Sequence, residues 1–365
     1  MPGVYISYPF CAQKCTYCNF ASGVFPRELE ARYVDALTFE VQAQNWAWRP
    51  ETVYLGGGTP SGMALGDIER ILHAIPGQGE WREATMEAAP GTITVERVEA
   101  WVRAGINRIS LGVQSFAQRE LARTGRKHSA EMVEREVALL REMGLDNINI
   151  DLIAGLPGQT RESWSESLRW IERLQPPHVS VYMLEIDEDS RLGNEVLLNG
   201  KRYGAPDVPS DEVIAELYET AVRALARLGI QRYEISNFAR PGFESVHNLK
   251  YWRLEPYVGC GADAHSFDGS QRTQNVESAA EYVERTGRGE SVRMESTAAN
   301  LAEERFFVGL RLTHGIQPEP EEWRKFDQPI GRFIDAGLLA REGPRLRLTD
   351  RGVLFANDVF AEFIS

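Results

Sequence analysis

Residues 4–18 read VYISYPFCAQKCTYC, so a short apolar run leads directly into three cysteines. The run Val4–Tyr8 is typical of a β-strand, and Cys11, Cys15 and Cys18 form a C-x3-C-x2-C array. Three thiolates are too few for a closed site, because structural zinc takes four ligands and most iron–sulfur clusters take four cysteines. The array therefore predicts a metal centre with one position left for a ligand that is not protein.

Two plainer interpretations of the array are a zinc knuckle and a disulfide. The disulfide is the weaker one, because no basic stretch followed by an apolar segment opens the sequence. We therefore expect a reducing, cytoplasmic location. The fourth cysteine, Cys260, lies far away between Gly259 and Gly261, and we expect a small buried residue there rather than a ligand.

Length and composition indicate a large enzyme-like protein. The chain has 365 residues, of which 43% are hydrophobic and 10% aromatic, enough for one large core and a smaller one. No run approaches the eighteen or so apolar residues of a membrane span, so we expect no transmembrane segment, while peripheral membrane contact stays open. The formal charge of −13 argues against nucleic acid as the main partner, because such proteins usually present a basic face.

The first half of the chain alternates short apolar runs with amphipathic helical patterns. This alternation predicts parallel strands joined by right-handed helical crossovers. Six such units, rather than eight, predict an α/β fold built as an incomplete (β/α)6 barrel, with its chemistry at the carboxyl ends of the strands. The expected strands are 4–8, 52–55, 84–88, 108–113, 147–153 and 178–184, and the expected helices are 27–44, 67–75, 93–104, 130–143 and 161–174.

The cysteine array resembles the signature of the radical S-adenosylmethionine (SAM) superfamily. That resemblance implies a 4Fe-4S cluster on the three cysteines, SAM on the fourth iron, and Tyr5 and Tyr17 beside the cofactor. The glycine run 55–61, LGGGTPS, follows the second expected strand and is similar to the motif that receives the amino end of SAM. The resemblance assigns Gly57, Gly58 and Thr59 to SAM contacts. Taken alone, a glycine-rich segment is more often only a turn.

Four polar residues near the ends of later strands match further SAM positions of the superfamily. They are Glu87, Gln114, Arg126 and Asp151. A carboxylate suits ribose hydroxyls because it accepts two hydrogen bonds, and a guanidinium suits the methionine carboxylate. Each also has a plainer interpretation, since either carboxylate could cap a helix and the arginine could be a solvated charge.

Within the superfamily the chain resembles the HemN/HemW branch. Coproporphyrinogen dehydrogenases carry another cysteine soon after the third, whereas Cys18 is followed by Asn19 and Phe20, as in the HemW-type haem chaperones. The string HNLKYW at 247–252 is similar to a HemW motif associated with haem, which makes His247 a candidate iron ligand. The alternative is a buried, hydrogen-bonded histidine among core aromatics, with His265 as the rival ligand.

We expect three parts: the radical SAM barrel and its extension at 1–235, a connecting region at 236–295, and a HemN-type C-terminal domain at 296–365. The sequence of the last part predicts a helix over 298–313, a hairpin that pairs 333–339 with 346–349, and a helix from Asp350. Together these elements form a winged-helix-like α+β pattern. We expect an irregular connection over 269–290.

The favoured function is a haem chaperone that keeps a SAM-bound 4Fe-4S cluster. The alternatives are a radical SAM enzyme acting on a porphyrinogen, as coproporphyrinogen III dehydrogenases do, a class C radical SAM methyltransferase, and a zinc-binding structural module. The expected partners are haem or a porphyrin, a haem-acceptor protein, and an electron donor such as flavodoxin or ferredoxin if SAM is cleaved. No catalytic residue is assigned.

Overall fold

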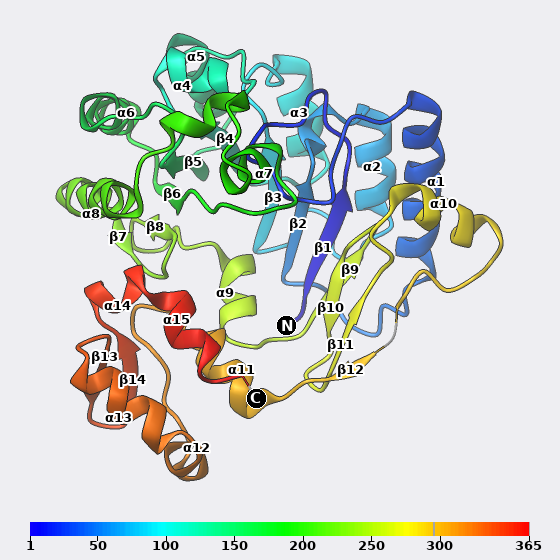
Figure 1. The fold of residues 1–365 in the computed structure, drawn as a ribbon. Helices are drawn as coiled ribbons and strands as arrows, with labels where there is room; N and C mark the ends of the chain where they lie inside the picture. The colour runs from blue at the N-terminus through cyan, green and yellow to red at the C-terminus, as the bar shows by residue number, and fades with distance from the viewer. Residues whose placement is uncertain (295, 365) are drawn as a thin grey trace.

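The structure is a computed structural model that describes residues 1–294 and 296–364 (Figure 1). Its centre is a parallel sheet of six strands that pair in chain order. All six expected strands are confirmed, with ends that move by two residues at most. They are β1 (Gly3–Tyr8), β2 (Thr52–Gly57), β3 (Glu83–Ala88), β4 (Arg108–Gln114), β5 (Ile148–Ala154) and β6 (His178–Met183).

Helices between the strands cover the outer face of this sheet (Figure 1). The five expected helices are also confirmed to within two residues at each end. They are α1 (Arg27–Ala43), α2 (Leu65–His73), α3 (Val95–Arg103), α5 (Ala130–Glu142) and α6 (Arg161–Leu174), with the short α4 (Gln118–Arg123) and the 3-10 turn η1 (Pro60–Gly62) in addition.

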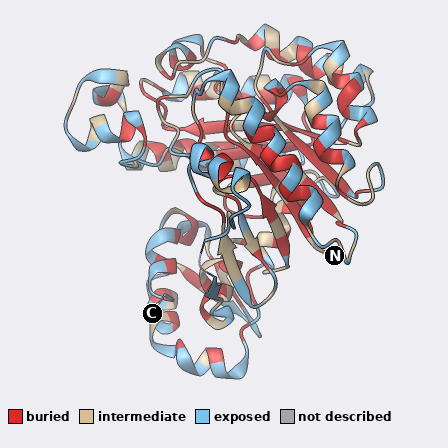
Figure 2. Cartoon of the chain, turned by 90° about the vertical axis from the view of Figure 1, so that its right-hand side faces the viewer, coloured by how far each residue is buried: buried red, intermediate tan, exposed pale blue. Residues whose placement is uncertain are grey.

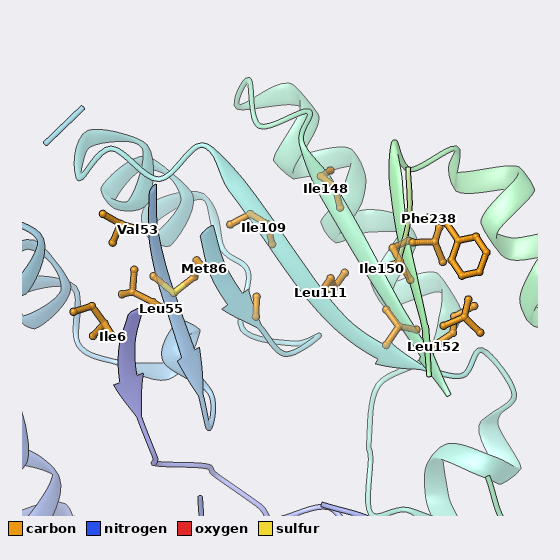
Figure 3. Packing of buried hydrophobic residues seen from close by; sticks show 14 of the residues in the cluster. Ile6, Val53, Leu55, Met86, Ile109, Leu111, Ile148, Ile150, Leu152 and Phe238 are labelled. Carbon is orange, nitrogen blue, oxygen red and sulfur yellow. The ribbon is translucent and has the colours of Figure 1, made fainter. Parts of the chain in front are cut away.

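The outward side chains of the strands and the apolar faces of the helices form one core. Ile6, Leu55, Leu111 and Ile150 are each 0% exposed and lie side by side between the layers (Figure 3). Strands buried on both faces read as near-continuous apolar runs, which is why their positions are legible in the sequence. Three of these helices, α3, α5 and α6, begin at a hydroxyl residue that caps them; the Thr160 side chain, for example, accepts from the Ser163 amide.

The sheet continues past the barrel at both edges, so the barrel stays open. Beyond β1 lie β9 (Tyr257–Cys260), β10 (His265–Phe267), β11 (Gln271–Gln274) and β12 (Thr297–Ala298), and beyond β6 lie β8 (Asn237–Ala239) and β7 (Gln231–Arg232). Only β9 in these extensions runs parallel to its barrel neighbour. The stretch 269–290, expected to be irregular, instead contains β11 and helix α10 (Ala279–Gly287).

Three further helices join the barrel to its extensions: α7 (Arg191–Leu197), α8 (Asp211–Arg227) and α9 (Val246–Trp252), with the 3-10 turn η2 (Arg202–Asp207). Helix α9 lies at the end of the barrel where the strands begin (Figure 1). None of the described helices is both long and apolar enough to cross a membrane.

The C-terminal part is a separate small α+β layer (Figures 1 and 2). It contains α11 (Leu301–Phe307), the 3-10 turn η3 (Gly309–Arg311), α12 (Pro320–Lys325), α13 (Asp327–Asp335), β13 (Leu339–Glu342), β14 (Arg345–Leu348), α14 (Asp350–Leu354) and α15 (Ala356–Ala361). Buried rings hold it together, with Phe306 at 4.5 Å from Phe326 and 4.6 Å from Phe363 between centroids.

Two expectations for this part are wrong in detail. The hairpin begins at Leu339, not Phe333, because Ile330 and Phe333 face the core three residues apart, as in a helix. The expected helix 298–313 is also shorter, since α11 ends at Phe307 and a 3-10 turn follows.

Candidate functional site

The cysteine loop lies at the carboxyl end of β1, at the end of the barrel that we call the mouth. Cys11, Cys15 and Cys18 are free and partly exposed. The loop is held by its own backbone, because the Cys11 amide donates to Gly23 O at 2.8 Å and the Gly23 amide donates to Pro9 O at 2.9 Å. The fourth cysteine, Cys260, is fully buried in β9, as expected.

Neighbouring segments clamp the loop from two sides. The Thr16 amide donates to Thr124 O at 3.3 Å, and the Leu192 amide donates to Thr16 O at 2.8 Å. Asn19 adds a side-chain bond to Asp187 at 2.8 Å. The thiols are therefore carried by a loop that is fixed against the rest of the barrel mouth.

The glycine run brings the end of β2 against this loop. The Gly58 amide donates to Tyr8 O at 2.7 Å, and the Thr59 amide donates to Phe10 O at 2.9 Å. A Cβ on Gly58 would lie 2.6 Å from Phe10 O, and Gly57 has a φ of +106°, so both positions favour glycine. Burial raises the pKa of the Cys11 thiol, and the hydroxyls of Thr59 and Ser22 oppose this shift. Ser22 Oγ also lies 3.8 Å from Cys18 Sγ.

A small cavity of about 110 Å³ opens between the loop and the strand ends. Its lining includes Tyr5, Ser7, Gly57, Glu87 and Asp263. Tyr5 stacks on Tyr54 with 6.0 Å between ring centroids. Three of the predicted SAM-site residues, Tyr5, Gly57 and Glu87, thus meet in one cavity beside the cysteine loop.

Glu87 is held at the edge of this cavity by two donors. Tyr54 Oη donates to Oε1 at 2.9 Å, and the Gly57 amide donates to Oε2 at 3.2 Å. Burial raises the pKa of Glu87 to about 7, and the negative charge of Asp151 acts in the same direction, while the two hydrogen bonds oppose the shift. The carboxyl is therefore poised to change its charge near neutral pH.

Gln114 ends β4 in a strained conformation and has an unused acceptor. Its φ is +70° at a bulge between β4 and β5, and its Oε1 is buried without a hydrogen-bond partner in the described part of the chain. Buried amide oxygens are rarely left unpaired, and positive φ at a non-glycine residue is often found at binding sites. This oxygen therefore marks a place where a ligand donor fits.

Arg126 and Asp151 approach the same region from neighbouring segments. Arg126 Nη1 donates to Gly112 O at 2.7 Å and its Nε donates to Tyr17 Oη at 3.1 Å, so two separately predicted SAM-site residues, Tyr17 and Arg126, are in direct contact. Asp151 Oδ1 accepts from Asn149 Nδ2 at 2.7 Å, and burial raises the pKa of Asp151.

Sequence reasoning missed residues that support this site. Tyr54 holds Glu87, while Asn149 orients Asp151 and Asp263 lines the cavity. One signal for Tyr54 exists, since it stands two residues before Gly56 in β2 and so shares its inward face. Asp263 lies beyond β9, and only the added strand brings it to the cavity.

The donor set suits the cofactors that the resemblance implies. The three thiols are the soft donors that an iron–sulfur cluster takes, and the missing side chain of Gly58 lets the glycine run pack closely on the loop that carries them. Among the described residues, no three His, Cys, Asp or Glu side chains surround a single metal-ion position. The unpartnered Gln114 oxygen adds an acceptor that is consistent with a bound ligand.

His247 lies at the opposite end of the barrel, which we call the base. It is 1% exposed, and its Nδ1 and Nε2 are 2.8 Å from Thr52 Oγ1 and Tyr251 Oη respectively. Its ring stacks on Tyr54 at 5.2 Å, and burial, with Lys250 nearby, lowers its pKa to about 3. Both ring nitrogens are already engaged, so haem contact by His247 stays a prediction that this geometry does not favour.

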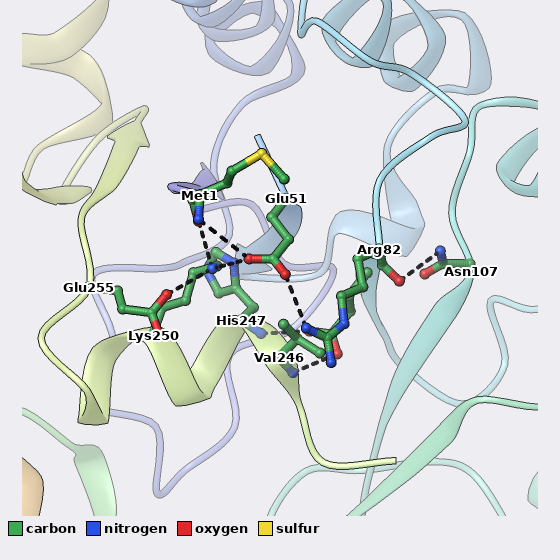
Figure 4. Close-up of polar contacts among 9 residues, drawn as sticks. Met1, Glu51, Arg82, Asn107, Val246, His247, Lys250 and Glu255 are labelled. Atoms are coloured by element: carbon green, nitrogen blue, oxygen red, sulfur yellow. Dashed lines mark hydrogen bonds and ion pairs between the residues drawn. The ribbon is translucent and has the colours of Figure 1, made fainter. Parts of the chain in front are cut away.

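The rest of the HNLKYW string anchors α9 to the base. Lys250 is 2% exposed and donates to Glu51 at 2.6 Å, Glu255 at 3.1 Å and Met1 O at 2.7 Å (Figure 4). Trp252 stacks under the Arg311 guanidinium at 4.4 Å, which links the helix to the C-terminal part. The string thus has a structural role that its sequence alone left open.

Glu83 caps the first turn of the same helix. Its carboxylate accepts from the Val246 amide at 2.8 Å, from the His247 amide at 2.9 Å and from Ser245 Oγ at 3.1 Å. A carboxylate at a helix start also complements the positive end of the helix dipole.

His265, the rival candidate, is in a contrasting position. It is exposed on β10, and its ring makes no hydrogen bond within residues 1–294 and 296–364.

The family comparisons agree with this arrangement. The radical SAM superfamily model matches residues 5–171, and the HemN C-terminal domain model matches residues 297–355. Among solved structures, coproporphyrinogen III oxidase (HemN) from Escherichia coli superposes with a TM-score of 0.84 at 21% identity, covering 99% of this chain and 90% of that one. This likeness confirms the fold.

Two curated relatives are similar along almost their whole length. Heme chaperone HemW from Lactococcus lactis is 34% identical over 99% of this chain and 96% of its own, and HemW from Bacillus subtilis is 33% identical over 100% and 99%. Membership of the radical SAM superfamily implies a 4Fe-4S cluster and SAM, as predicted. The chain belongs to the HemW family of the radical SAM superfamily.

Proposed function

We propose that the chain is a haem chaperone, a protein that binds haem and transfers it to an acceptor protein, and that it holds a 4Fe-4S cluster and SAM. The observation that carries this proposal is the similarity to two proteins named heme chaperones over nearly the full length of each chain. The loop after Cys18 agrees with it, because no further cysteine follows there.

We assign the cluster to Cys11, Cys15 and Cys18. Two observations support this assignment. The loop that carries the thiols is fixed at the barrel mouth, and the hydroxyls of Thr59 and Ser22 lie beside the Cys11 thiol. When bound, the cluster offers an open iron site to SAM and a source of one electron.

For SAM, we assign Glu87 to the ribose hydroxyls and Arg126 to the methionine carboxylate. Gln114 is supported by its unpartnered oxygen. The remaining assignments carry over from the superfamily pattern, with Gly57, Gly58 and Thr59 at the amino end and Tyr5, Tyr17 and Asp151 beside the cofactor. Arg126 also holds Tyr17 in place, so the two act as one unit.

The finer biological setting belongs to the same proposal. We place the protein in a reducing cytoplasm, with flavodoxin or ferredoxin as the electron donor whenever SAM is cleaved. We keep the division into a barrel at 1–235, a connecting region at 236–295 and a C-terminal domain at 296–365. The connecting region supplies β8 and β9, so it adds strands to the sheet as well as linking the barrel to the C-terminal domain.

An anaerobic experiment on the reconstituted full chain tests the proposal. Haem, coproporphyrinogen III and SAM are offered in parallel, and absorption spectra and products are recorded. We expect a shifted Soret band with haem and no conversion of coproporphyrinogen III. Turnover of coproporphyrinogen III at enzyme-like rates, or methyl transfer from SAM, would replace the chaperone with a radical SAM enzyme.

A further inference from the structure

A second, larger cavity lies next to the cysteine loop. Its volume is about 530 Å³, within the range of small-molecule sites, and it lies between that loop and the start of α10. Ala21, Phe25, Val276 and Met294 form its apolar wall, while Glu277 and Glu281 also line it. The SAM-site residues described above do not line this cavity.

The chain around this cavity exposes large apolar side chains. Phe20 is 66% exposed, Val24 63%, Met294 51% and Phe25 38%. Three of these residues belong to a single six-residue stretch of the cysteine loop. Apolar groups gathered at one place on a surface indicate a binding site, whereas scattered ones are ordinary.

His265 does not line this cavity, but the sheet register places it on the same face as Met294, which does. His265 is paired with Gln274 across β10 and β11, and a bridge between Asn275 and Arg293 sets Met294 opposite Gln274. The Met294 amide donates to Gln274 O at 2.7 Å. Directly paired residues of antiparallel strands point to the same face, so His265, Gln274 and Met294 form one cross-strand row at steps of roughly 5 Å.

The state of His265 differs from that of His178 and His247 inside the barrel. Both ring nitrogens of His247 and of His178 are hydrogen-bonded, the latter to Asn149 at 2.6 Å and Tyr233 at 2.9 Å. His265 is exposed and its ring has no hydrogen bond in the described part of the chain. A neutral imidazole in that state can bind iron without breaking an existing contact.

We propose that haem docks on this surface, with His265 binding the iron and Phe25 and Met294 packing on the porphyrin. This inference rests on the proposed haem-chaperone function and adds the place where the cargo binds. Haem fits because it combines a wide, flat apolar ring with an iron that takes imidazole, and this face offers an apolar wall at the cavity and an imidazole two strand steps from Met294. The carboxylates of Glu277 and Glu281 disfavour burial of the propionates, which therefore point to solvent.

The site also puts the cargo beside the cluster loop. Ala21 and Phe25 belong to the same loop as Cys18, and Ala21 lines both the cavity of about 110 Å³ and the larger one. Haem bound here is therefore next to the predicted cluster and SAM. Because one short loop contacts both sites, a shift of this loop at one site also moves residues at the other.

The test uses the anaerobically reconstituted full chain and titration with haem. His265→Ala is expected to alter the Soret band and to weaken haem binding about tenfold or more. Met294→Glu is expected to weaken binding by a similar factor, because it places a charge against the porphyrin. His314→Ala is the matched control, since His314 is also exposed and without a hydrogen bond among the described residues but lies in the C-terminal part.

Cluster content and SAM affinity are measured for each variant, and both are expected to stay at the wild-type level. Wild-type affinity and spectrum in both His265→Ala and Met294→Glu would overturn the proposed docking surface. An unchanged spectrum in His265→Ala alone would overturn the iron ligand. A wild-type chain that binds no haem at all would instead refute the chaperone function, so the two failures are distinguishable.

Discussion

The two ends of the barrel carry equally polar side chains but use them differently. At the base, Glu83 accepts three hydrogen bonds and both nitrogens of His247 are engaged. At the mouth, the Gln114 amide oxygen has no partner in the described residues and three thiols are free. Satisfied buried groups stabilise a fold, whereas unsatisfied ones indicate a missing ligand. At the base Trp252 Nε1 and Arg108 Nε are also buried without a partner among the described residues, so the contrast rests on Glu83 and His247 there and on Gln114 and the thiols at the mouth. The mouth is the proposed binding end of the barrel.

This difference teaches that a distinctive motif is not always a binding site. The HNLKYW string is as recognisable as the cysteine array, yet it fills the base with contacts to Thr52, Glu51 and Arg311. His265 has no such string around it and remains free. Substitutions at each end can show whether the two ends are as distinct as their hydrogen bonds indicate.

The largest effect is expected at the mouth, from replacing Cys11, Cys15 and Cys18 together by Ala. Because these thiols are the proposed ligands, bound iron, sulfide and the broad visible absorption should be lost completely. Iron analysis and absorption spectra after anaerobic reconstitution measure this. Cys260→Ala is the matched control and should keep its cluster, since that thiol is buried in β9. A full cluster in the triple variant would show that the cluster does not bind to the cysteines at the mouth.

At the base, Glu83→Ala should lower the free energy of unfolding by about 2 to 4 kcal/mol. The substitution leaves Ser245 Oγ and the Val246 and His247 amides without their acceptor in a buried place. Chemical denaturation measures the change. Glu80→Ala is the control, because Glu80 is 72% exposed in its pair with Arg49 and should change stability by about 1 kcal/mol at most. Equal losses in both would mean that the base is not specially stabilised.

His247→Ala should lower the free energy of unfolding by about 1 to 3 kcal/mol, because it leaves Thr52 and Tyr251 unpaired and removes a stacked ring. The haem spectrum should stay as in the wild type, and His314→Ala should change neither quantity. A variant with wild-type stability and an altered Soret band would show that His247 is the haem ligand. The base would then be a binding site as well as the mouth.

The sequence predicted the barrel well because its strands are buried on both faces. Val4–Tyr8 and Ile148–Ala154 are apolar almost throughout, so their periodicity is visible locally. The edge strands were not predictable in this way: β11 reads QRTQ and becomes a strand only through its pairing with β10. Phe333 was placed in a strand because its apolar neighbours fit either period, and the tertiary core selected a helix.

The site divides along the same line. The cysteines and the glycine run were legible because their spacing and composition are local. The carboxylates came from the family pattern, and the hydrogen bonds that set their charge come from Tyr54, Gly57 and Asn149 in other strands. Distances between strands are not written in any one segment, so the raised pKa of Glu87 could not be predicted, and the paired state of His247 could be named only as one of two alternatives.

The smallest effect is expected in the pH dependence of SAM binding, set by Glu87 at the mouth. Burial raises its pKa to about 7, with Asp151 adding to the shift and Tyr54, Gly57 and Arg108 opposing it. Only the ionised carboxylate accepts well from both ribose hydroxyls, so SAM affinity should rise with pH up to about 7 and level off above it. Below the midpoint, affinity should fall by up to about tenfold for each pH unit.

Calorimetry between about pH 6 and pH 8 measures this, with cluster content checked at each pH. Glu87→Gln should bind SAM more weakly at high pH and lose the dependence, while Tyr54→Phe should move the midpoint upward because it removes a hydrogen bond to the ionised form. A flat wild-type profile, or the same profile in Glu87→Gln, would show that ionisation of Glu87 does not control SAM binding.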